Sequence, residues 1–225
     1  EGKTVTVVVT ATPAPTATPD AGGSTAERAG LTLAMPKNYI SGGPIIPADT
    51  RAPKSGGTFT VAFKSDPPNL DSTKSTSHLT QLTTSSIYER LVMWPTEPGY
   101  NIMENRLEPG LAESWTMSGD GLVYTLKLRK GVKWHNLPPV NGREFTASDV
   151  KFSFDYFTKE GSVQAKSFAT VSSVEAVDSH TVKYTLTRRN PGFLFQISNT
   201  GTGFIIPKEV VDADGDLDKT AIGTG

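Results

Sequence analysis

The stretch Thr125–Phe157, TLKLRKGVKWHNLPPVNGREFTASDVKFSFDYF, decides the fold of this chain. It begins within a segment in which apolar and polar side chains alternate. One face of this segment is formed by Leu122, Tyr124, Leu126 and Leu128. The opposite face is formed by Val123, Thr125, Lys127 and Arg129. Because successive side chains of a strand point to opposite faces, the pattern predicts a strand with one face in the core and the other in water.

The same stretch ends in a predicted helix. Thr146 offers a side-chain acceptor to the unpaired N–H groups of the first turn, and Asp149 places a carboxylate at the positive end of the helix dipole. Val150, Phe154 and Phe157 then recur at i, i+4 and i+7, so they form one buried stripe. The sequence therefore predicts a capped, amphipathic helix after the strand and its loop.

Composition limits the class of protein. A chain of 225 residues can form one or two domains with a substantial core. Its formal net charge of −1 gives no broad electrostatic reason to expect nucleic acid or an anionic membrane as a partner. The absence of cysteine excludes disulfides, thiolate zinc sites and cysteine nucleophiles. No apolar run reaches the length of about 18 residues that a membrane span needs.

The N-terminal part has a biased composition. Residues 1–25 are rich in threonine, alanine and proline and contain no aromatic residue, so they bury too little apolar surface to offset the entropy of ordering. We interpret them as a tether, and residues 26–55 as a transitional segment. The alternation in Thr4–Thr10 leaves a paired strand open as the alternative. The start at Glu1, without a methionine or a signal peptide, indicates a processed or engineered start.

The rest of the chain mixes strand and helix patterns without a regular βαβ repeat. A strand is expected at 58–63, a helix at 77–92 and a loop at 94–107. The predicted helix has an apolar side made of Leu79, Leu82, Ile87 and Leu91. Hairpin turns are expected at 118–121 and 178–180, a short helix after Asn190, and a loop at 199–203. This mixture predicts a mixed α/β or α+β fold.

Motifs of enzymes and metal sites are incomplete. No G-x-S-x-G motif occurs, and the histidines His78, His135 and His180 lie in unrelated contexts. Gly201 and Gly203 lack the third glycine of a phosphate-binding loop. We therefore expect no enzyme, no cofactor and no catalytic residue.

Acidic residues have structural interpretations. Asp212, Asp214, Asp216 and Asp218 resemble the start of a calcium loop, but Leu217 occupies the position of its glycine, so we predict a solvated acidic turn and no metal. Asp66 and Asp71 flank prolines and are expected to stabilise turns rather than to act as an acid–base pair.

Three motifs occur in a fixed order in the middle of the chain. They are PGLAESW at Pro109–Trp115, LRKGVKWH at Leu128–His135 and FTASDVKFS at Phe145–Ser153. In this order they resemble the family 5 extracellular solute-binding proteins, which supply peptides, oligosaccharides, nickel and related solutes to ABC importers. The resemblance extends to GGTFTVAFKSDPPNLD (56–71), IYERLV (87–92), IIPKEVV (205–211) and IGTG (222–225). It covers about residues 56–225 and leaves Glu1–Ser55 outside.

The resemblance implies a type II fold like that of periplasmic binding proteins. Residues 56–225 would form a first-lobe portion, without the second lobe and the C-terminal return. The implied function is capture of a solute between two lobes and its delivery to ABC permease membrane subunits, without covalent chemistry. The expected solute is an oligopeptide, with an oligosaccharide or nickel or its chelate as alternatives. Lipoproteins of the family carry a similar spacer, so we expect an extracytoplasmic protein that contacts the membrane only through an N-terminal lipid anchor.

The resemblance also places the loop before the first helix in the ligand cleft. Its residues Ser72–Gln81 are dense in hydroxyls that suit a polar ligand, although serine and threonine also cap helices and stabilise turns. Asn199–Gly203 is a second candidate, because its glycines permit close backbone approach. Among the tryptophans, Trp115 and Trp134 are assigned to the core. The candidate ligand-binding residues are Ser75, Thr76, Ser77, His78, Gln81, Trp94, Thr200, Thr202 and Gly203.

Two interpretations from other classes stay open. A proline- and threonine-rich linker also suits a secreted glycoside hydrolase, although a coherent catalytic set is missing. A structural surface module on the same tether would show no cleft and no stabilisation by a solute. For His135, the resemblance implies a structural role in the turn after a strand.

Overall fold

The computed structural model describes residues 4–7, 59–62, 65–95 and 105–225, which fall into two compact units, Glu1–Lys64 and Ser65–Gly225. In the first unit, β1 (Thr4–Val7) pairs with β2 (Phe59–Ala62) in antiparallel register. The strand left open as the alternative for Thr4–Thr10 is thus present over Thr4–Val7. The remainder of the predicted tether and most of the predicted loop at 94–107 lie outside the described residues.

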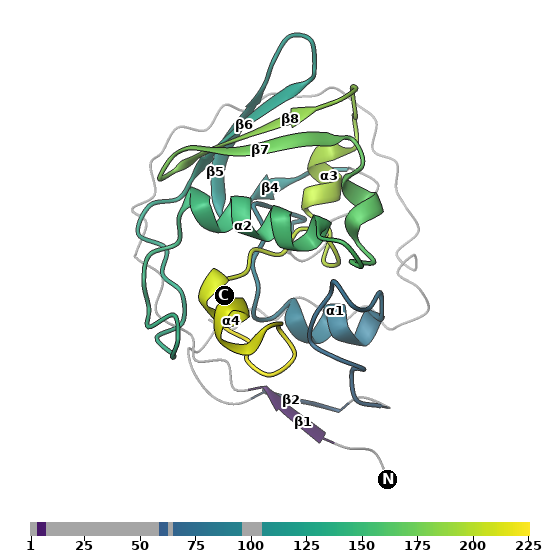
Figure 1. Cartoon of the computed structure of the whole chain (residues 1–225), viewed down its shortest axis with the longest axis vertical. Helices are drawn as coiled ribbons and strands as arrows, with labels where there is room; N and C mark the ends of the chain where they lie inside the picture. The colour runs from purple at the N-terminus through teal and green to yellow at the C-terminus, as the bar shows by residue number, and fades with distance from the viewer. Residues whose placement is uncertain (1–3, 8–58, 63–64, 96–104) are drawn as a thin grey trace, which may run out of the picture. The chain divides into compact units, whose positions relative to one another are not determined.

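The second unit is built on a four-stranded antiparallel sheet in the order β5-β6-β8-β7 (Figure 1). Its strands are β5 (Ala112–Met117), β6 (Val123–Leu128), β7 (Val171–Asp178) and β8 (Thr181–Leu186). Both predicted hairpins are therefore confirmed. In β6, Tyr124, Leu126 and Leu128 are buried, while Lys127 is exposed. The face predicted to enter the core does so.

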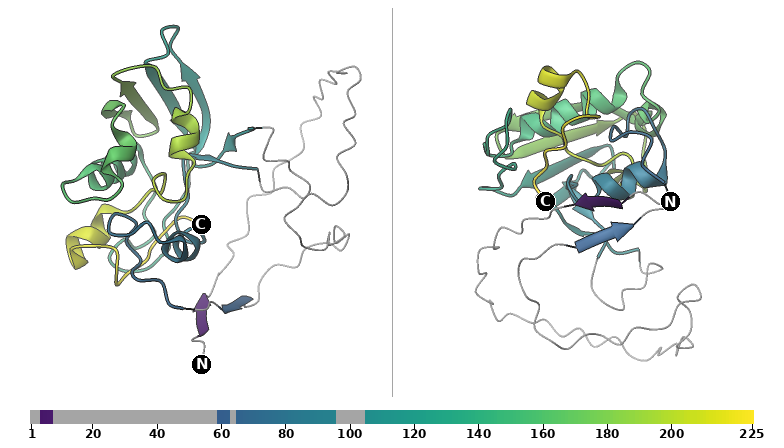
Figure 2. Two further views of the ribbon diagram at one scale, coloured as in Figure 1. Left: turned by 90° about the vertical axis from the view of Figure 1, so that its right-hand side faces the viewer. Right: turned by 90° about the horizontal axis from the view of Figure 1, so that it is seen from below.

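Helix α2 (Ala147–Thr158) lies along one face of this sheet, against β7 and β8 (Figures 1 and 2). The backbone N–H of Thr146 donates to Asp149 Oδ2 at 2.9 Å, which satisfies a donor at the start of the helix. Val150 and Phe157 are buried, and Phe154 is partly buried against the same core. The predicted cap and apolar stripe are confirmed.

An ion-pair network fixes the N-terminal end of α2 to α4 (Lys208–Asp214). The Arg143 guanidinium donates to Asp149 Oδ1 and to Glu209 Oε2, both at 2.7 Å. Its carbon Cζ lies 5.8 Å from the centre of the Trp134 ring. One planar cation with several donors thus holds a loop and two helices together.

The prediction of a long helix with an apolar side at 77–92 is wrong. The helix α1 spans only His78–Thr84, and Leu82 is 48% exposed. The buried side is formed by Thr80, Thr83 and Thr84. The Thr80 hydroxyl donates to the Asn69 carbonyl at 2.8 Å and the Thr84 hydroxyl donates to the Thr80 carbonyl at 2.7 Å. Threonine can be buried here because local carbonyls satisfy its hydroxyl donor.

Shorter elements complete the second unit. They are β3 (Val92–Met93), β4 (Glu108–Pro109), the 3₁₀ helix η2 (Ala165–Phe168) and α3 (Phe193–Ile197). The predicted helix after Asn190 is confirmed by α3. None of the helices that the structure describes has the length and apolar character that a membrane crossing requires.

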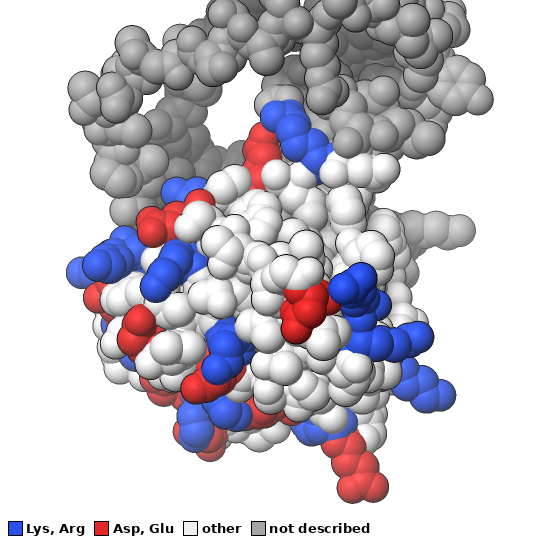
Figure 3. All heavy atoms as spheres, turned by 90° about the horizontal axis from the view of Figure 1, so that it is seen from above, with Lys and Arg blue, Asp and Glu red and all other residues white. Residues whose placement is uncertain are grey.

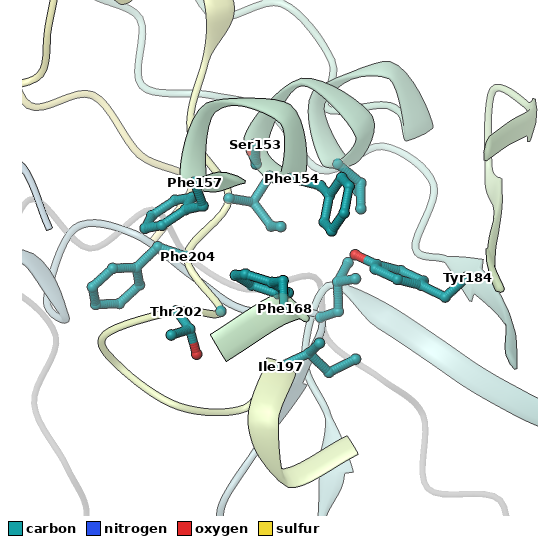
Figure 4. Close-up of a pocket in the computed structure, with 12 residues that line it drawn as sticks. Ser153, Phe154, Phe157, Phe168, Tyr184, Ile197, Thr202 and Phe204 are labelled. Carbon is teal, nitrogen blue, oxygen red and sulfur yellow. The ribbon is translucent and has the colours of Figure 1, made fainter. Parts of the chain in front are cut away.

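Aromatic rings fill the core between α2 and the sheet (Figure 4). Phe154, Phe157, Phe168, Tyr184 and Phe204 surround a void of about 20 Å³. A void of this size has room for about one water molecule, so this region is packed core rather than a ligand cavity. Trp134 is buried and Trp115 is partly buried against the same core, as predicted.

The C-terminal motif IGTG is held against the loop after β6. The backbone N–H of His135 donates to the Gly223 carbonyl at 2.9 Å, and the His135 ring lies 2.6 Å from the Gly225 carbonyl oxygen. A Cβ added at Gly223 would lie 1.7 Å from the carbonyl oxygen of Ile87, so no larger residue fits. The structural role implied for His135 is confirmed.

Candidate ligand-binding hollow

A hollow of about 410 Å³ opens where four segments of the second unit meet. The segments are the loop before α1 with α1 itself, the turn at η2, helix α3 and the loop at 199–203. The lining is formed by Thr76, Gln81, Gln164, Ser167, Gly192, Phe195, Gln196, Asn199, Gly201 and Thr202. These residues include all three glutamines of the chain, and none of them is charged. We call this site the glutamine hollow.

The structure brings the two predicted ligand-binding segments together. Thr76 and Gln81 line the glutamine hollow from one side and Thr202 lines it from another. The Thr200 hydroxyl lies beside it and donates to Gln81 Oε1 at 3.4 Å. Residues more than a hundred positions apart in the sequence thus share one site, while their role in binding stays a prediction.

Other candidate residues lie outside the lining. Ser75 Oγ accepts the backbone N–H of Ser77 at 3.0 Å, so it stabilises the turn before α1. Ser77 is the N-cap residue of that helix, and His78 is exposed. Gly203 is packed on backbone, because a Cβ there would lie 2.0 Å from the carbonyl oxygen of Ile197. The alternative of capping and turn roles therefore fits these positions.

Trp94 lies behind the lining rather than in it. Its ring packs on the ring of Phe195, with the two centres 5.2 Å apart. Phe195 itself lines the glutamine hollow. Trp94 therefore supports an apolar wall of the site without being one of its lining residues.

Four lining residues were not predicted from the sequence, namely Gln164, Ser167, Phe195 and Gln196. They come from a 3₁₀ turn and a five-residue helix, and the pattern of such short elements does not say which way a side chain faces. The scarcity of glutamine in the chain was the available signal, since every glutamine is in the lining.

Hydrogen bonds fix two of these glutamines. Gln164 is 6% exposed, and its Nε2 donates to the Ser72 carbonyl at 3.1 Å. Gln196 Oε1 accepts from Asn190 Nδ2 at 3.2 Å, and its Nε2 donates to the Ser167 carbonyl. The amide groups are thereby oriented before any ligand arrives.

A buried carboxylate anchors the loop that carries Thr76. Asp71 is fully buried and its Oδ1 accepts the N–H of Thr73 at 2.8 Å and the Thr73 hydroxyl at 2.7 Å. Its Oδ2 accepts the hydroxyl of Tyr156, on α2, at 2.6 Å. Burial, together with the hydrogen bond to Asp71, raises the pKa of Tyr156. The predicted turn role of Asp71 is confirmed, and the contact ties the loop to α2.

Lys74 joins the same loop to the acidic turn after α4. Its Nζ lies 2.7 Å from Asp216 Oδ2 and 2.6 Å from Asp218 Oδ2. The hydrogen bond from Lys74 lowers the pKa of Asp216. The two aspartates of the predicted acidic turn remain accessible to solvent, and a lysine distant in sequence pairs with them, which was not predicted. Within the described ranges, no group of histidine, aspartate and glutamate side chains has the arrangement of a metal site.

Charges of both signs are interspersed on the face of the molecule seen in Figure 3.

The glutamine hollow itself offers amides, hydroxyls, glycine backbone and one aromatic ring. Such groups both donate and accept hydrogen bonds, so the site suits an uncharged polar group. Its lining contains no nucleophile paired with a base.

The chain resembles known proteins in sequence and in structure. Residues 106–225, more than half of the chain, match the family of bacterial extracellular solute-binding proteins, family 5 Middle. Over 164 residues the chain is 35% identical to the dipeptide-binding protein of Escherichia coli strain K12. The matched region is 62% of this chain and 28% of that protein.

Two solved structures share the fold. The binding protein MoaA of A. tumefaciens R10, in complex with mannopinic acid, has a TM-score of 0.62 and 37% identity over 71% of this chain and 31% of its own. The binding protein DppA of Helicobacter pylori, in complex with the peptide STSA, has a TM-score of 0.61 and 32% identity over 71% of this chain and 34% of its own.

The chain spans 28–34% of the length of these three proteins. Its mixed α/β architecture is that of the solved periplasmic binding proteins, over a part of their length. The motifs in their order, the fold and the match over residues 106–225 lead to the same conclusion: the chain belongs to family 5 of the bacterial extracellular solute-binding proteins.

Proposed function

We propose that residues 56–225 form the first-lobe portion of a solute-binding protein that serves an ABC importer. The observation that carries this proposal is the glutamine hollow, in which two distant segments present uncharged hydrogen-bonding groups. The family match and the share of the relatives' length that the chain covers support it. The remaining part of the site would come from a second lobe.

The proposed mechanism is capture without covalent chemistry. A solute binds against the glutamine hollow, a second lobe closes over it about a hinge, and the closed form docks on the membrane permease. A lipid-modified cysteine on the N-terminal side of β1 would anchor the protein on the outer side of the cytoplasmic membrane. Mass spectrometry of the protein extracted from native membranes tests the anchor, and an unmodified N-terminus would contradict it.

We propose an oligopeptide as the solute. The dipeptide-binding relative and the complex of the Helicobacter pylori protein with the peptide STSA support this choice. A peptide group has one N–H donor and one carbonyl acceptor, which the amides and hydroxyls of the lining can satisfy. A small organic acid is the second candidate, because the structure at 37% identity holds mannopinic acid.

A thermal-shift screen of the full-length protein tests the function. The probes are di- to pentapeptides, mannopinic acid, oligosaccharides and nickel chelates. A probe at 100 times its dissociation constant should add about 2.7 kcal/mol to the free energy of unfolding if it binds only the folded state. We expect stabilisation by peptides. The absence of a shift with every probe would contradict solute capture and favour the structural surface module.

A further inference from the structure

Two glutamines of the glutamine hollow each have one amide atom without a hydrogen-bond partner among the described residues. Gln81 Oε1 accepts the Thr200 hydroxyl, whereas no group of the described residues accepts from Gln81 Nε2. Gln164 Nε2 donates to the Ser72 carbonyl, whereas no described group donates to Gln164 Oε1. Both side chains line the hollow. A ligand there meets an N–H donor from α1 and a carbonyl acceptor beside η2.

The acceptor belongs to a side chain that is almost fully buried. Gln164 is 6% exposed and is one of the residues that line the hollow. A ligand N–H in the hollow would replace solvent as the hydrogen-bond partner of its amide oxygen. The position of Gln164 is set by the Ser72 carbonyl and therefore by the loop that Asp71 anchors.

The free donor is held against backbone. Gln81 Nε2 lies 2.9 Å from the place that a Cβ would occupy on Gly201, so the amide rests on that glycine. The hydroxyl of Thr200 holds the other end of the amide. Both polar groups are thus oriented in the unliganded protein, which reduces the entropy lost on binding.

We propose that the glutamine hollow binds an uncharged amide group of the solute, with the solute carbonyl on Gln81 Nε2 and the solute N–H on Gln164 Oε1. This inference rests on the proposed function and makes Gln81 and Gln164 its specificity-determining residues. The ring of Phe195, backed by Trp94, supplies an apolar wall beside the amide.

The same lining disfavours a charged group. A carboxylate or an ammonium group placed in the hollow would lose hydration and meet no opposite charge among the lining residues. A neutral carboxamide or peptide group loses less hydration and finds both partners. The hollow therefore discriminates by the charge of the group it receives, in addition to its shape.

The substitution Gln81→Glu tests the donor with little change in shape. The glutamate still offers an acceptor to the Thr200 hydroxyl, but an acceptor replaces the free donor and adds a negative charge. The matched control is Asn136→Asp, which adds the same charge at an exposed position outside the hollow. The full-length protein and both variants are titrated calorimetrically with the tripeptides Ala-Gln-Ala and Ala-Lys-Ala.

We expect Gln81→Glu to weaken binding of Ala-Gln-Ala at least about 10-fold, which corresponds to about 1.4 kcal/mol. Ala-Lys-Ala should lose less, because its ammonium group can pair with the new carboxylate. Asn136→Asp should change neither affinity by more than about 2-fold, as expected of a distant surface charge. If Gln81 has a purely structural role, the substitution should weaken the binding of both peptides to the same extent.

The outcomes separate the two proposals. If the wild type binds the tripeptides and Gln81→Glu binds them as Asn136→Asp does, the amide assignment is wrong while the peptide function stands. An equal loss for both peptides, together with a lower melting temperature of the free protein, would also overturn the assignment. If the wild type binds neither tripeptide, the proposed peptide function fails, and the amide assignment fails with it.

Discussion

Two glycines of the loop at 199–203 serve different purposes. A Cβ on Gly201 would meet the end of the flexible Gln81 side chain at 2.9 Å, whereas a Cβ on Gly203 would meet the Ile197 carbonyl oxygen at 2.0 Å. A side-chain end can move aside, but the backbone of α3 cannot do so without loss of packing. Gly201 therefore belongs to the site and Gly203 to the fold.

Substitution by alanine at these glycines should separate binding from stability. Gly201→Ala should displace the Gln81 amide and weaken peptide binding. Its free energy of unfolding, measured with urea, should change by less than about 1 kcal/mol. Gly203→Ala should lower the free energy of unfolding by about 1–3 kcal/mol because it overpacks a buried turn. Urea titration and calorimetry measure both effects. Equal stability of the two variants would contradict the assignment.

The free energy of unfolding should depend on pH because of the Glu209 carboxyl group. Hydrogen bonds from Arg143 lower the pKa of Glu209 below that of an unpaired glutamate. The pair therefore contributes its full stability above about pH 4.5 and loses it as the pH falls through the lower folded-state pKa, because the unfolded chain takes up the proton first.

Glu209→Gln should accordingly lose stability at neutral pH and show a shallower decline in stability below about pH 4.5. Urea unfolding at a series of pH values measures the decline. Glu175→Gln, in the exposed pair with Lys183, is the matched control. A Glu209→Gln profile that is parallel to the wild-type profile would refute the role of the Arg143 pair.

Among the elements, α2 connects the core to the loop that carries Thr76. The Tyr156 hydroxyl donates to Asp71 Oδ2 at 2.6 Å, across 85 positions of sequence. A buried carboxylate needs its hydrogen bonds, since an unmatched buried charge is costly. The position of the loop with Thr76 and Gln81 thus depends on a contact with α2, the longest of the described helices.

Tyr156→Phe should destabilise the protein by about 1–3 kcal/mol and weaken peptide binding, because Asp71 loses a donor and the loop loses its anchor. Tyr184→Phe is the control. Tyr184 is also buried, but its hydroxyl has no hydrogen-bond partner among the described residues. Thermal unfolding and calorimetry compare the two. Similar effects of both substitutions would show that the Asp71 contact adds nothing beyond packing.

Prediction from sequence succeeded where one face of an element meets a large core. Strand β6 and helix α2 follow their apolar periods because Leu126, Val150 and their neighbours face the same core. Prediction failed at α1, whose buried side is threonine and whose leucine Leu82 is exposed. Burial there is decided by hydrogen bonds to local carbonyls, and hydrophobic periodicity carries no information about them.

The candidate site was predictable in part for a related reason. Its loops at 72–81 and 199–203 show unusual composition, so their polar residues could be identified. Gln164 and Gln196 lie in short elements whose orientation follows from packing between distant segments. Sequence reasoning on single segments does not give such orientations.

For the molecule as a whole, the glutamine hollow offers only uncharged groups to a solute. A peptide also has charged ends, and the described lining contains no charged group to pair with them. We expect those partners to come from the second lobe. The 225-residue chain should therefore bind Ala-Gln-Ala at least about 10-fold more weakly than the full-length protein, in a calorimetric comparison. Equal affinities would contradict a site shared between two lobes.

Binding in the glutamine hollow can be observed through the three glutamines of this chain. Labelling with glutamine that carries ¹⁵N in its side chain gives one pair of amide signals for each of Gln81, Gln164 and Gln196. Titration of the 225-residue chain with Ala-Gln-Ala is followed by NMR. The glutamine hollow predicts progressive shifts of the Gln81 and Gln164 signals, assigned with single-residue variants. Unmoved glutamine signals at peptide concentrations that shift other resonances would show that the solute binds elsewhere.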